Sequence, residues 1–331
     1  MEKWFVIINN SSKDKWSSFI WSDIEDEAEI RLNSNVLKNK FAKTLYKIHF
    51  SNVLNRKIWL PFKGVWNKFS SINEEELCDG MNYMIFQSNV KFSPSYLKRI
   101  KARYNVEVIL YFPDTISKLG IANTVEEFER YKLKYQIDGC YSFDLDDCQK
   151  YGIEFFDVYS VKRFKDNSIS SDIVYVGAYR EEQRLLELLR ICENTDEFFE
   201  CDFNMVGVER KKQRYPMKIT YNKYLKYQDV LSKINSSKCI LELVNTGQSG
   251  NTLRFKEAIG YRKKLLTNNM KVLENKCYNP AFMQVFSSVE SIDWEWLKKE
   301  ECIEYPNMSE FSPCKLIDII RKSRKYKYNE A

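Results

Sequence analysis

The sequence predicts an α/β protein built from two facing Rossmann-like domains with an interdomain cleft. Apolar runs of strand length alternate with helical patterns along the chain, which is typical of parallel sheets. This alternation stops in a polar stretch at 157–171 and restarts at Asp172. The chain has 331 residues and no shorter internal repeat, so it suits two domains of about 150 residues each.

The first domain is predicted to span residues 1–160. Its expected strands are apolar runs bounded by polar or proline-containing turns, at 4–8, 58–62, 82–87, 106–112 and 139–143. Its expected helices have apolar residues at helical spacing or a capping signal, at the end of 25–47, at 95–104 behind Ser93-Pro94, and at 124–135. Pro61 places the strand at 58–62 at a sheet edge or a strand end.

The second domain is predicted to span residues 172–310. Its expected strands are at 172–176, 203–208, 239–244 and 264–267. Amphipathic helices are expected between them, at 181–193, at 223–235 and after Thr252. Residues 311–331 are expected to form a last helix at 315–322 and a basic tail.

Composition indicates an ordinary globular protein, with 44% hydrophobic and 30% charged residues. Nine cysteines without a CxxC pair indicate reduced thiols. No leader peptide and no apolar run of 18 residues is seen, so we expect a cytoplasmic protein. The net charge of +6 comes without a nucleic-acid-binding module, so no nucleic-acid partner is expected. The basic stretches 210–214 and 321–327 suit an anionic membrane surface or a diphosphate, and equally a solvated charged face.

The most informative stretch is the polar loop 245–252, which joins an apolar strand to a helix. Ligands in open α/β sheets bind at the carboxyl ends of strands, and free N–H groups at a helix start favour phosphate. Thr252 can cap this helix, and Arg254 and Glu257 share a face of its first turn. A cation and a carboxylate there suit a ligand with a diphosphate and vicinal hydroxyls, such as a nucleotide sugar. A loop of this kind can also join strand to helix without binding anything.

The run GNTLRFKEAIGYRKKLLTNN, 250–269, resembles the corresponding segment of bacterial lipopolysaccharide and capsular polysaccharide glycosyltransferases of the GT-B fold. The resemblance implies that Glu257 binds the ribose hydroxyls of the donor and that Ser249, Gly250, Asn251 and Thr252 hold its diphosphate with Arg254. It also implies that the final helix crosses back to the first domain. Many retaining members carry a second Glu where this chain has Ser249, so stereochemistry is left open.

The segment VYVGAYREEQRLLELL, 174–189, resembles the start of the second domain in the same glycosyltransferases. Gly177 would let the backbone approach a ligand, and Arg180 could neutralise the leaving diphosphate without a metal. Lys218 is a further phosphate candidate. Arg180 could also be an ordinary surface residue at the start of a helix.

Candidates for proton transfer and metal binding are few. Asp114 follows the strand at 106–112 and is the candidate base for an acceptor hydroxyl, although Pro-Asp-Thr is also a common turn. His49 is the only histidine and is expected to be structural. Asp144 and Asp146 resemble the DxD motif of metal-dependent GT-A enzymes, although Asp144 would also cap the helix at 146–151. No metal or other cofactor is expected.

The sequence therefore predicts a metal-independent glycosyltransferase that moves a hexose or related sugar from a nucleotide-sugar donor to a surface glycan. The acceptor would be a lipopolysaccharide, capsule or exopolysaccharide precursor, lipid-linked at the inner membrane face, with peripheral contact to the anionic membrane. Two alternatives stay open. One is a metal-dependent GT-A-like transferase that uses Asp144 and Asp146, and the other is a non-catalytic nucleotide- or glycan-binding protein.

Overall fold

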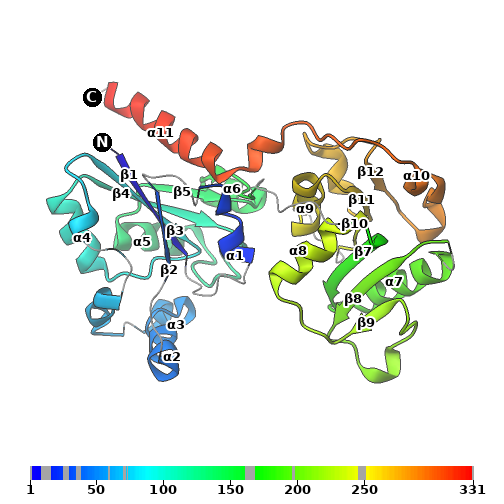
Figure 1. Ribbon diagram of the computed structural model, residues 1–331. Helices are drawn as coiled ribbons and strands as arrows, with labels where there is room; N and C mark the ends of the chain where they lie inside the picture. The colour runs from blue at the N-terminus through cyan, green and yellow to red at the C-terminus, as the bar shows by residue number, and fades with distance from the viewer. Residues whose placement is uncertain are drawn as a thin grey trace. The chain divides into compact units, whose positions relative to one another are not determined.

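The structure, a computed structural model, describes residues 2–8, 16–24, 30–34, 39–58, 60–69, 72, 74–160, 168–195, 198–244 and 251–329. The chain divides into two compact units. Unit 1 combines Met1–Tyr159 with Pro313–Ala331, and unit 2 is Ser160–Ser312. Each unit contains one six-stranded parallel sheet with helices packed on it (Figure 1), so the predicted pair of Rossmann-like domains is confirmed at the level of the two sheets.

The sheet of unit 1 has the strand order β2-β1-β3-β4-β5-β6. Its strands are β1 (Glu2–Ile8), β2 (Ile30–Ser34), β3 (Met81–Gln87), β4 (Val106–Phe112), β5 (Gly139–Ser142) and β6 (Glu154–Phe155). Its helices are α1 (Trp16–Phe19), α2 (Lys40–His49), α3 (Asn52–Lys57), α4 (Pro94–Arg103), α5 (Val125–Tyr135), α6 (Leu145–Tyr151) and α11 (Pro313–Asn329). Short 3₁₀ turns add Ser22–Ile24, Lys63–Phe69 (η2) and Glu74–Glu76. The strand order reverses between β1 and β3, which is the switch point of a doubly wound sheet.

The sheet of unit 2 has the order β12-β11-β10-β7-β8-β9. Its strands are β7 (Ser171–Ala178), β8 (Cys201–Val206), β9 (Ile219–Tyr221), β10 (Ser237–Glu242), β11 (Lys264–Thr267) and β12 (Met283–Val285). Its helices are α7 (Glu182–Thr195), α8 (Tyr227–Asn235), α9 (Leu253–Tyr261) and α10 (Trp294–Lys298). Its 3₁₀ turns are Arg210–Lys212, Met270–Glu274, Val289–Ser291 and Met308–Phe311. This is the Rossmann order, with the switch point between β7 and β10.

Most predicted elements are confirmed, and the exceptions have local causes. The strand expected at 58–62 is wrong. Among the described residues there, Ile58 caps the end of α3, and the 3₁₀ turn η2 begins at Lys63. Pro61 lacks a backbone N–H, and Phe62 has a left-handed backbone with φ of 61°, so this apolar run cannot continue a sheet ladder.

The strand β2 lies inside the stretch 25–47, where only a helix was expected. It pairs in parallel with β1, with Trp4 opposite Ile30 and Ile8 opposite Ser34. The helix expected at the end of that stretch is confirmed as α2, which Asn39 caps through its side chain. Strands β6, β9 and β12 have only two or three residues each, too few to produce an apolar pattern.

The last helix, α11, belongs to unit 1 and lies beside the N-terminal strand (Figure 1). The Nε atom of Arg321 is 2.8 Å from a carboxylate oxygen of Glu2, and its guanidinium lies 5.5 Å from the Trp4 ring. Leu316, Ile317 and Ile320 are buried. No helix in the described part of the chain has both the length and the apolar character needed to span a bilayer.

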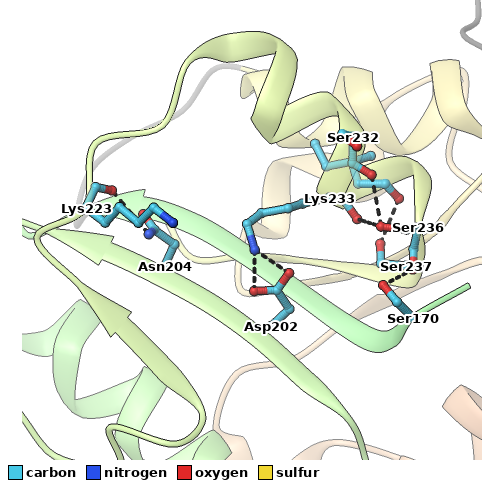
Figure 2. Close-up of polar contacts among 9 residues, drawn as sticks. Ser170, Asp202, Asn204, Lys223, Ser232, Lys233, Ser236 and Ser237 are labelled. Carbon is cyan, nitrogen blue, oxygen red and sulfur yellow. Dashed lines mark hydrogen bonds and ion pairs between the residues drawn. The ribbon is translucent and has the colours of Figure 1, made fainter. Parts of the chain in front are cut away.

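Polar contacts hold α8 against the sheet of unit 2 (Figure 2). The ammonium group of Lys233 lies 2.7 and 2.5 Å from the two carboxylate oxygens of Asp202 on β8. At the end of the helix, the Ser236 hydroxyl donates to the Ser232 carbonyl and the Ser237 hydroxyl to the Ile234 carbonyl. These contacts fix the helix that begins with Tyr227, whose hydroxyl reaches the candidate site.

Candidate functional site

The candidate site lies at the switch point of unit 2, where β7 and β10 are neighbours and α9 begins. Here the carboxyl ends of two neighbouring parallel strands carry connections to opposite sides of the sheet, the position at which open α/β sheets bind ligands. The helix α9 starts behind Thr252, whose hydroxyl accepts the backbone N–H groups of Arg254 at 3.1 Å and Phe255 at 3.3 Å. The predicted N-terminal cap is therefore present.

Glu257 is the buried anion of this site, with no exposed surface. One of its carboxylate oxygens forms an ion pair with the Arg254 guanidinium, and the other accepts the Tyr227 hydroxyl at 2.8 Å. Burial raises the pKa of this carboxyl group, and the charge of Arg254 opposes that increase most strongly. Both oxygens thus already have partners inside unit 2, with which a ligand at Glu257 would compete.

A second buried carboxylate, Glu242, lies at the end of β10 and was not predicted. The hydroxyls of Thr252 and Thr267 each donate to one of its two oxygens. Burial raises its pKa, whereas these two hydrogen bonds and the charges of Arg254 and Arg184 favour the ionised form. The only sequence signal was a lone acidic residue in the apolar run CILELV. Thr252 therefore links the start of α9 to the end of β10.

Arg184 joins the two strands at the switch point. Its guanidinium donates to the Ala178 carbonyl at the end of β7, at 3.1 Å, and to the Leu243 carbonyl just after β10. It stabilises the carboxyl edge by donating to carbonyl oxygens of both strand ends. Nothing in the amphipathic pattern of α7 distinguishes this arginine, because its partners are set by the tertiary fold.

Gly177 is required by packing against Tyr175. A Cβ atom at position 177 would lie 2.3 Å from the Tyr175 hydroxyl oxygen and 2.7 Å from Cζ. The Tyr175 hydroxyl is buried and has no hydrogen-bond partner among the described residues. Burial raises its pKa to about 12, against the charges of Arg184 and Arg254. A donor with no partner beside two arginines is available to an anionic oxygen at the switch point.

The structure locates two further residues of the predicted set near this edge. Arg180 is exposed between β7 and α7 and forms no ion pair with a described residue. Asn251 accepts a hydrogen bond from the Asn275 amide at 3.2 Å, just before the cap Thr252. Ser249 and Gly250 lie outside the described residues.

Lys218 is not brought to the site. Its ammonium group donates to the Cys192 carbonyl at 3.0 Å and lies 3.4 Å from the Thr195 hydroxyl. It therefore binds the end of α7, and it immediately precedes β9, at the amino edge of the sheet. A parallel strand carries its two ends to opposite edges, so Lys218 cannot join the residues at the carboxyl edge.

The candidate base Asp114 lies in unit 1, directly beyond the carboxyl end of β4. Its carboxylate accepts the Thr115 backbone N–H at 2.9 Å and is 3.7 Å from the Lys118 ammonium group. The side chain is about half exposed, at 48%. These contacts are those of a turn that leaves the carboxylate accessible to solvent.

The acidic pair Asp144 and Asp146 follows β5 in unit 1. Asp144 caps α6 by accepting the Asp147 backbone N–H at 2.9 Å, and Asp146 is exposed on that helix. Across the described ranges, no group of three or more His, Cys, Asp or Glu residues is placed to hold a metal ion. His49 accepts the Trp66 indole N–H at 2.7 Å, a structural contact.

The site thus combines the start of a helix, two arginines and two buried carboxylates at one sheet edge. The helix start and Arg254 favour an anionic group, and Glu257 can accept hydroxyl donors. Such a set can recognise a molecule that carries both a diphosphate and vicinal hydroxyls.

No family model matches the chain, and no curated protein matches it in sequence. Solved structures similar to it include the DNA-modifying enzyme β-glucosyltransferase, described with and without its substrate uridine diphosphoglucose, at 14% identity and a TM-score of 0.42, covering 86% of this chain and 84% of that chain. The lipopolysaccharide outer core galactosyltransferase WaaB in its apo form is 13% identical, with a TM-score of 0.39 and 86% coverage of both chains. The glycotransferase of kitacinnamycin is 8% identical, with a TM-score of 0.43, covering 96% of this chain and 98% of that chain. Likenesses this distant transfer no activity and no residue role to the chain.

Proposed function

We propose that the protein is a GT-B-type glycosyltransferase that transfers a sugar from a nucleotide-sugar donor to a surface glycan. The observation that carries this proposal is the cluster at the switch point of unit 2, where the capped start of α9, Arg254 and the buried Glu257 lie together. Diphosphate and ribose need an anion seat and a hydroxyl acceptor within one small site, and this cluster contains both.

The donor is proposed to bind by exchanging partners with Glu257. The ribose hydroxyls would donate to Glu257 in place of Arg254, and the released guanidinium would turn to the diphosphate. Ser249, Gly250, Asn251 and Thr252 would surround the diphosphate at the start of α9. Gly177 would keep the floor of this site clear. Lys218 is omitted because it binds the end of α7.

In the transfer step, an acceptor hydroxyl oxygen forms a bond to the anomeric carbon, and the bond from that carbon to the diphosphate breaks. The nucleoside diphosphate leaves with the electron pair, and Arg180 and Arg254 stabilise its charge. The acceptor proton passes to a carboxylate, for which Asp114 is the proposed base. These arginines can supply the positive charge that other transferases take from a metal ion.

The proposed acceptor is a precursor of lipopolysaccharide, capsule or exopolysaccharide that carries a lipid, held by unit 1. The protein would then be cytoplasmic and would contact the inner face of the cytoplasmic membrane. Part of the basic stretch 210–214 is already engaged, because Lys212 pairs with Glu182 and Lys211 lies 2.9 Å from Glu209. Arg321 likewise pairs with Glu2.

The donor proposal is tested by thermal unfolding of the full chain with UDP, GDP, CMP and TDP, each with and without EDTA. A nucleotide at 100 times its dissociation constant should stabilise the protein by about 2.7 kcal/mol. We expect one nucleotide class to stabilise the protein regardless of EDTA, and Glu257→Gln to abolish the effect. Tyr227→Phe is the matched control, because it removes one partner of Glu257 and keeps the carboxylate.

Turnover is tested separately by following nucleoside diphosphate release from the matching nucleotide sugar. If Arg180→Ala slows the release of nucleoside diphosphate and changes nucleotide affinity little, the result supports the leaving-group role of Arg180. Nucleotide binding without any release, over a panel of glycan acceptors, would instead support the non-catalytic binding protein. If nucleotide stabilisation of the protein is abolished by EDTA and by Asp144→Ala, the result supports the GT-A-like alternative.

A further inference from the structure

A surface pocket in unit 1 lies apart from all the residues assigned above. Its volume is about 540 Å³, and it is lined by Phe62, Lys63, Gly64, Ser93, Pro94, Ser95 and Lys134. These residues belong to the start of η2, the start of α4 and the end of α5. Because α4 follows β3, one side of the pocket belongs to the connection that leaves the carboxyl end of a strand at the switch point of this sheet.

Lysines dominate the electrostatics of this pocket. Lys63 is only 2% exposed, and burial together with the charges of Lys134 and Lys91 lowers its pKa to about 8. Burial and the charge of Lys47 lower the pKa of Lys91 to about 8 as well. The ammonium groups of Lys63 and Lys91 lie over the same Phe50 ring, at 5.7 and 5.8 Å from its centroid. These cations are therefore close enough to repel one another.

Two serine hydroxyls and the start of α4 also line the pocket, beside Phe62, Gly64 and Pro94. The hydroxyls of Ser93 and Ser95 lie 3.2 Å apart at the start of α4. The first turn of this ten-residue helix contains no acidic residue, and none of the described residues that line the pocket is acidic. The positive end of the helix dipole thus adds to the charge of the lysines.

We propose that this pocket binds a phosphate group. A phosphate offers several acceptor oxygens around a double negative charge, so it can accept from more than one of the lining donors. Lys63, whose ammonium group also donates to the Asn55 side chain, adds its charge to that of Lys134. The charge of the phosphate would also offset the repulsion between the lysines. The same chemistry occurs in a soluble phosphate ester and in a lipid headgroup. Phe62, at the rim, is 79% exposed, and it would contact the apolar part of a lipid.

Isothermal titration calorimetry of the full chain with inorganic phosphate tests the pocket. We expect Lys134→Gln to weaken binding about tenfold, because one charge-assisted contact is lost. Lys132→Gln is the matched control, because it removes the same charge from the same helix outside the pocket, and it should leave the affinity unchanged. Lys63→Gln should weaken binding further, and unchanged circular dichroism would show that this buried substitution still folds.

Hexyl phosphate and vesicles distinguish the two sources of phosphate. If hexyl phosphate binds more tightly than inorganic phosphate, the pocket is assigned to a lipid phosphate. This gain in affinity should be lost in Phe62→Ser and kept in Phe198→Ser. Phe198 is a suitable control because it is also 79% exposed. Co-sedimentation of the protein with phosphatidic acid vesicles, and not with phosphatidylcholine vesicles, would support the same assignment to a lipid phosphate. Equal affinity for the two soluble probes assigns a soluble phosphate ester.

The proposal is overturned if inorganic phosphate and hexyl phosphate both fail to bind. Equal weakening by Lys134→Gln and Lys132→Gln would also overturn it, because the binding would then follow net charge alone. The result does not depend on the donor site of unit 2, where Lys134→Gln should leave nucleotide stabilisation unchanged.

Discussion

The site of unit 2 and the pocket of unit 1 use positive charge in opposite ways. At the switch point of unit 2, Arg254 pairs with the fully buried Glu257, and Arg184 donates to the Ala178 and Leu243 carbonyls. In unit 1, the charges of Lys91 and Lys134 both lower the pKa of Lys63 beside an open pocket. Both units are parallel α/β sheets, and the site chemistry comes from the side chains placed on them.

This difference implies different costs of binding. A ligand at Glu257 would compete with the contacts of Arg254 and Tyr227, whereas an anion in the pocket of unit 1 would offset the repulsion among its lysines. The first arrangement favours selectivity, because only a ligand that replaces every lost hydrogen bond binds well. The stability of unit 2 should therefore depend on the internal pairs at its carboxyl edge.

The largest effect is expected for Glu257→Ala. Removing this carboxylate leaves the Arg254 guanidinium, only 17% exposed, without its partner, so the free energy of unfolding should fall by about 3–5 kcal/mol. Urea unfolding of the variant and the wild type measures this loss of free energy. The exposed pair Lys271–Glu274 is the control, and Glu274→Ala should cost less than about 1 kcal/mol. Similar losses in both variants would show that Glu257 is not the buried anchor described here.

The next largest effect is expected for Thr252→Val, which should lower the free energy of unfolding by about 3 kcal/mol. It removes the cap of α9 and also a hydrogen bond to the buried Glu242. Thr252→Ser keeps both contacts and should unfold close to the wild-type urea midpoint. If serine were as damaging as valine, the methyl group and not the hydroxyl would be responsible.

Gly177→Ala should cost about 2 kcal/mol, because the added methyl group would lie 2.3 Å from the Tyr175 hydroxyl. Tyr175→Phe removes that oxygen, so the double variant should recover part of the loss. Gly64→Ala is the control, since no heavy atom lies within 4 Å of its added Cβ. Fully additive losses in the double variant would contradict the proposed contact.

The smallest effect concerns pH. Burial raises the pKa of Glu242 above 4.5, so its protonated form favours the folded state. Its contribution to stability is complete below pH 4.5 and is lost as the pH rises through the folded pKa. The stability of Glu242→Gln relative to wild type should therefore improve with rising pH above 4.5. An unchanged difference across this range would mean that Glu242 ionises as readily in the folded state as in the unfolded one.

Local patterns predicted the elements well wherever the sequence itself determines them. The strands β4 and β11 have the predicted bounds, because turn residues follow each directly, Pro113-Asp114 after β4 and Asn268-Asn269 after β11. Helix α4 starts where Ser93-Pro94 indicated, and Asp144 caps α6. The strand expected at 58–62 failed because an apolar run alone does not show whether a neighbouring strand is available to pair with it.

The candidate site was predicted only in part, for the same reason. Thr252, Arg254 and Glu257 share one short segment, so spacing on a helix was enough to group them. Glu242 and Arg184 join them through contacts that the fold creates, and Arg184 reaches a carbonyl 59 positions away. Lys218 was grouped with them because the three-residue strand β9, which it precedes, leaves no apolar pattern that would have placed it at the amino edge.

Hydrogen–deuterium exchange with a saturating nucleoside diphosphate tests the central claim most directly. If the carboxyl edge of unit 2 binds the donor, amide exchange should slow at 251–257 and 177–184, with or without EDTA. The same nucleotide should give no such protection in Glu257→Gln. Protection confined to 144–151 and abolished by EDTA, or no protection at any segment, would contradict the account.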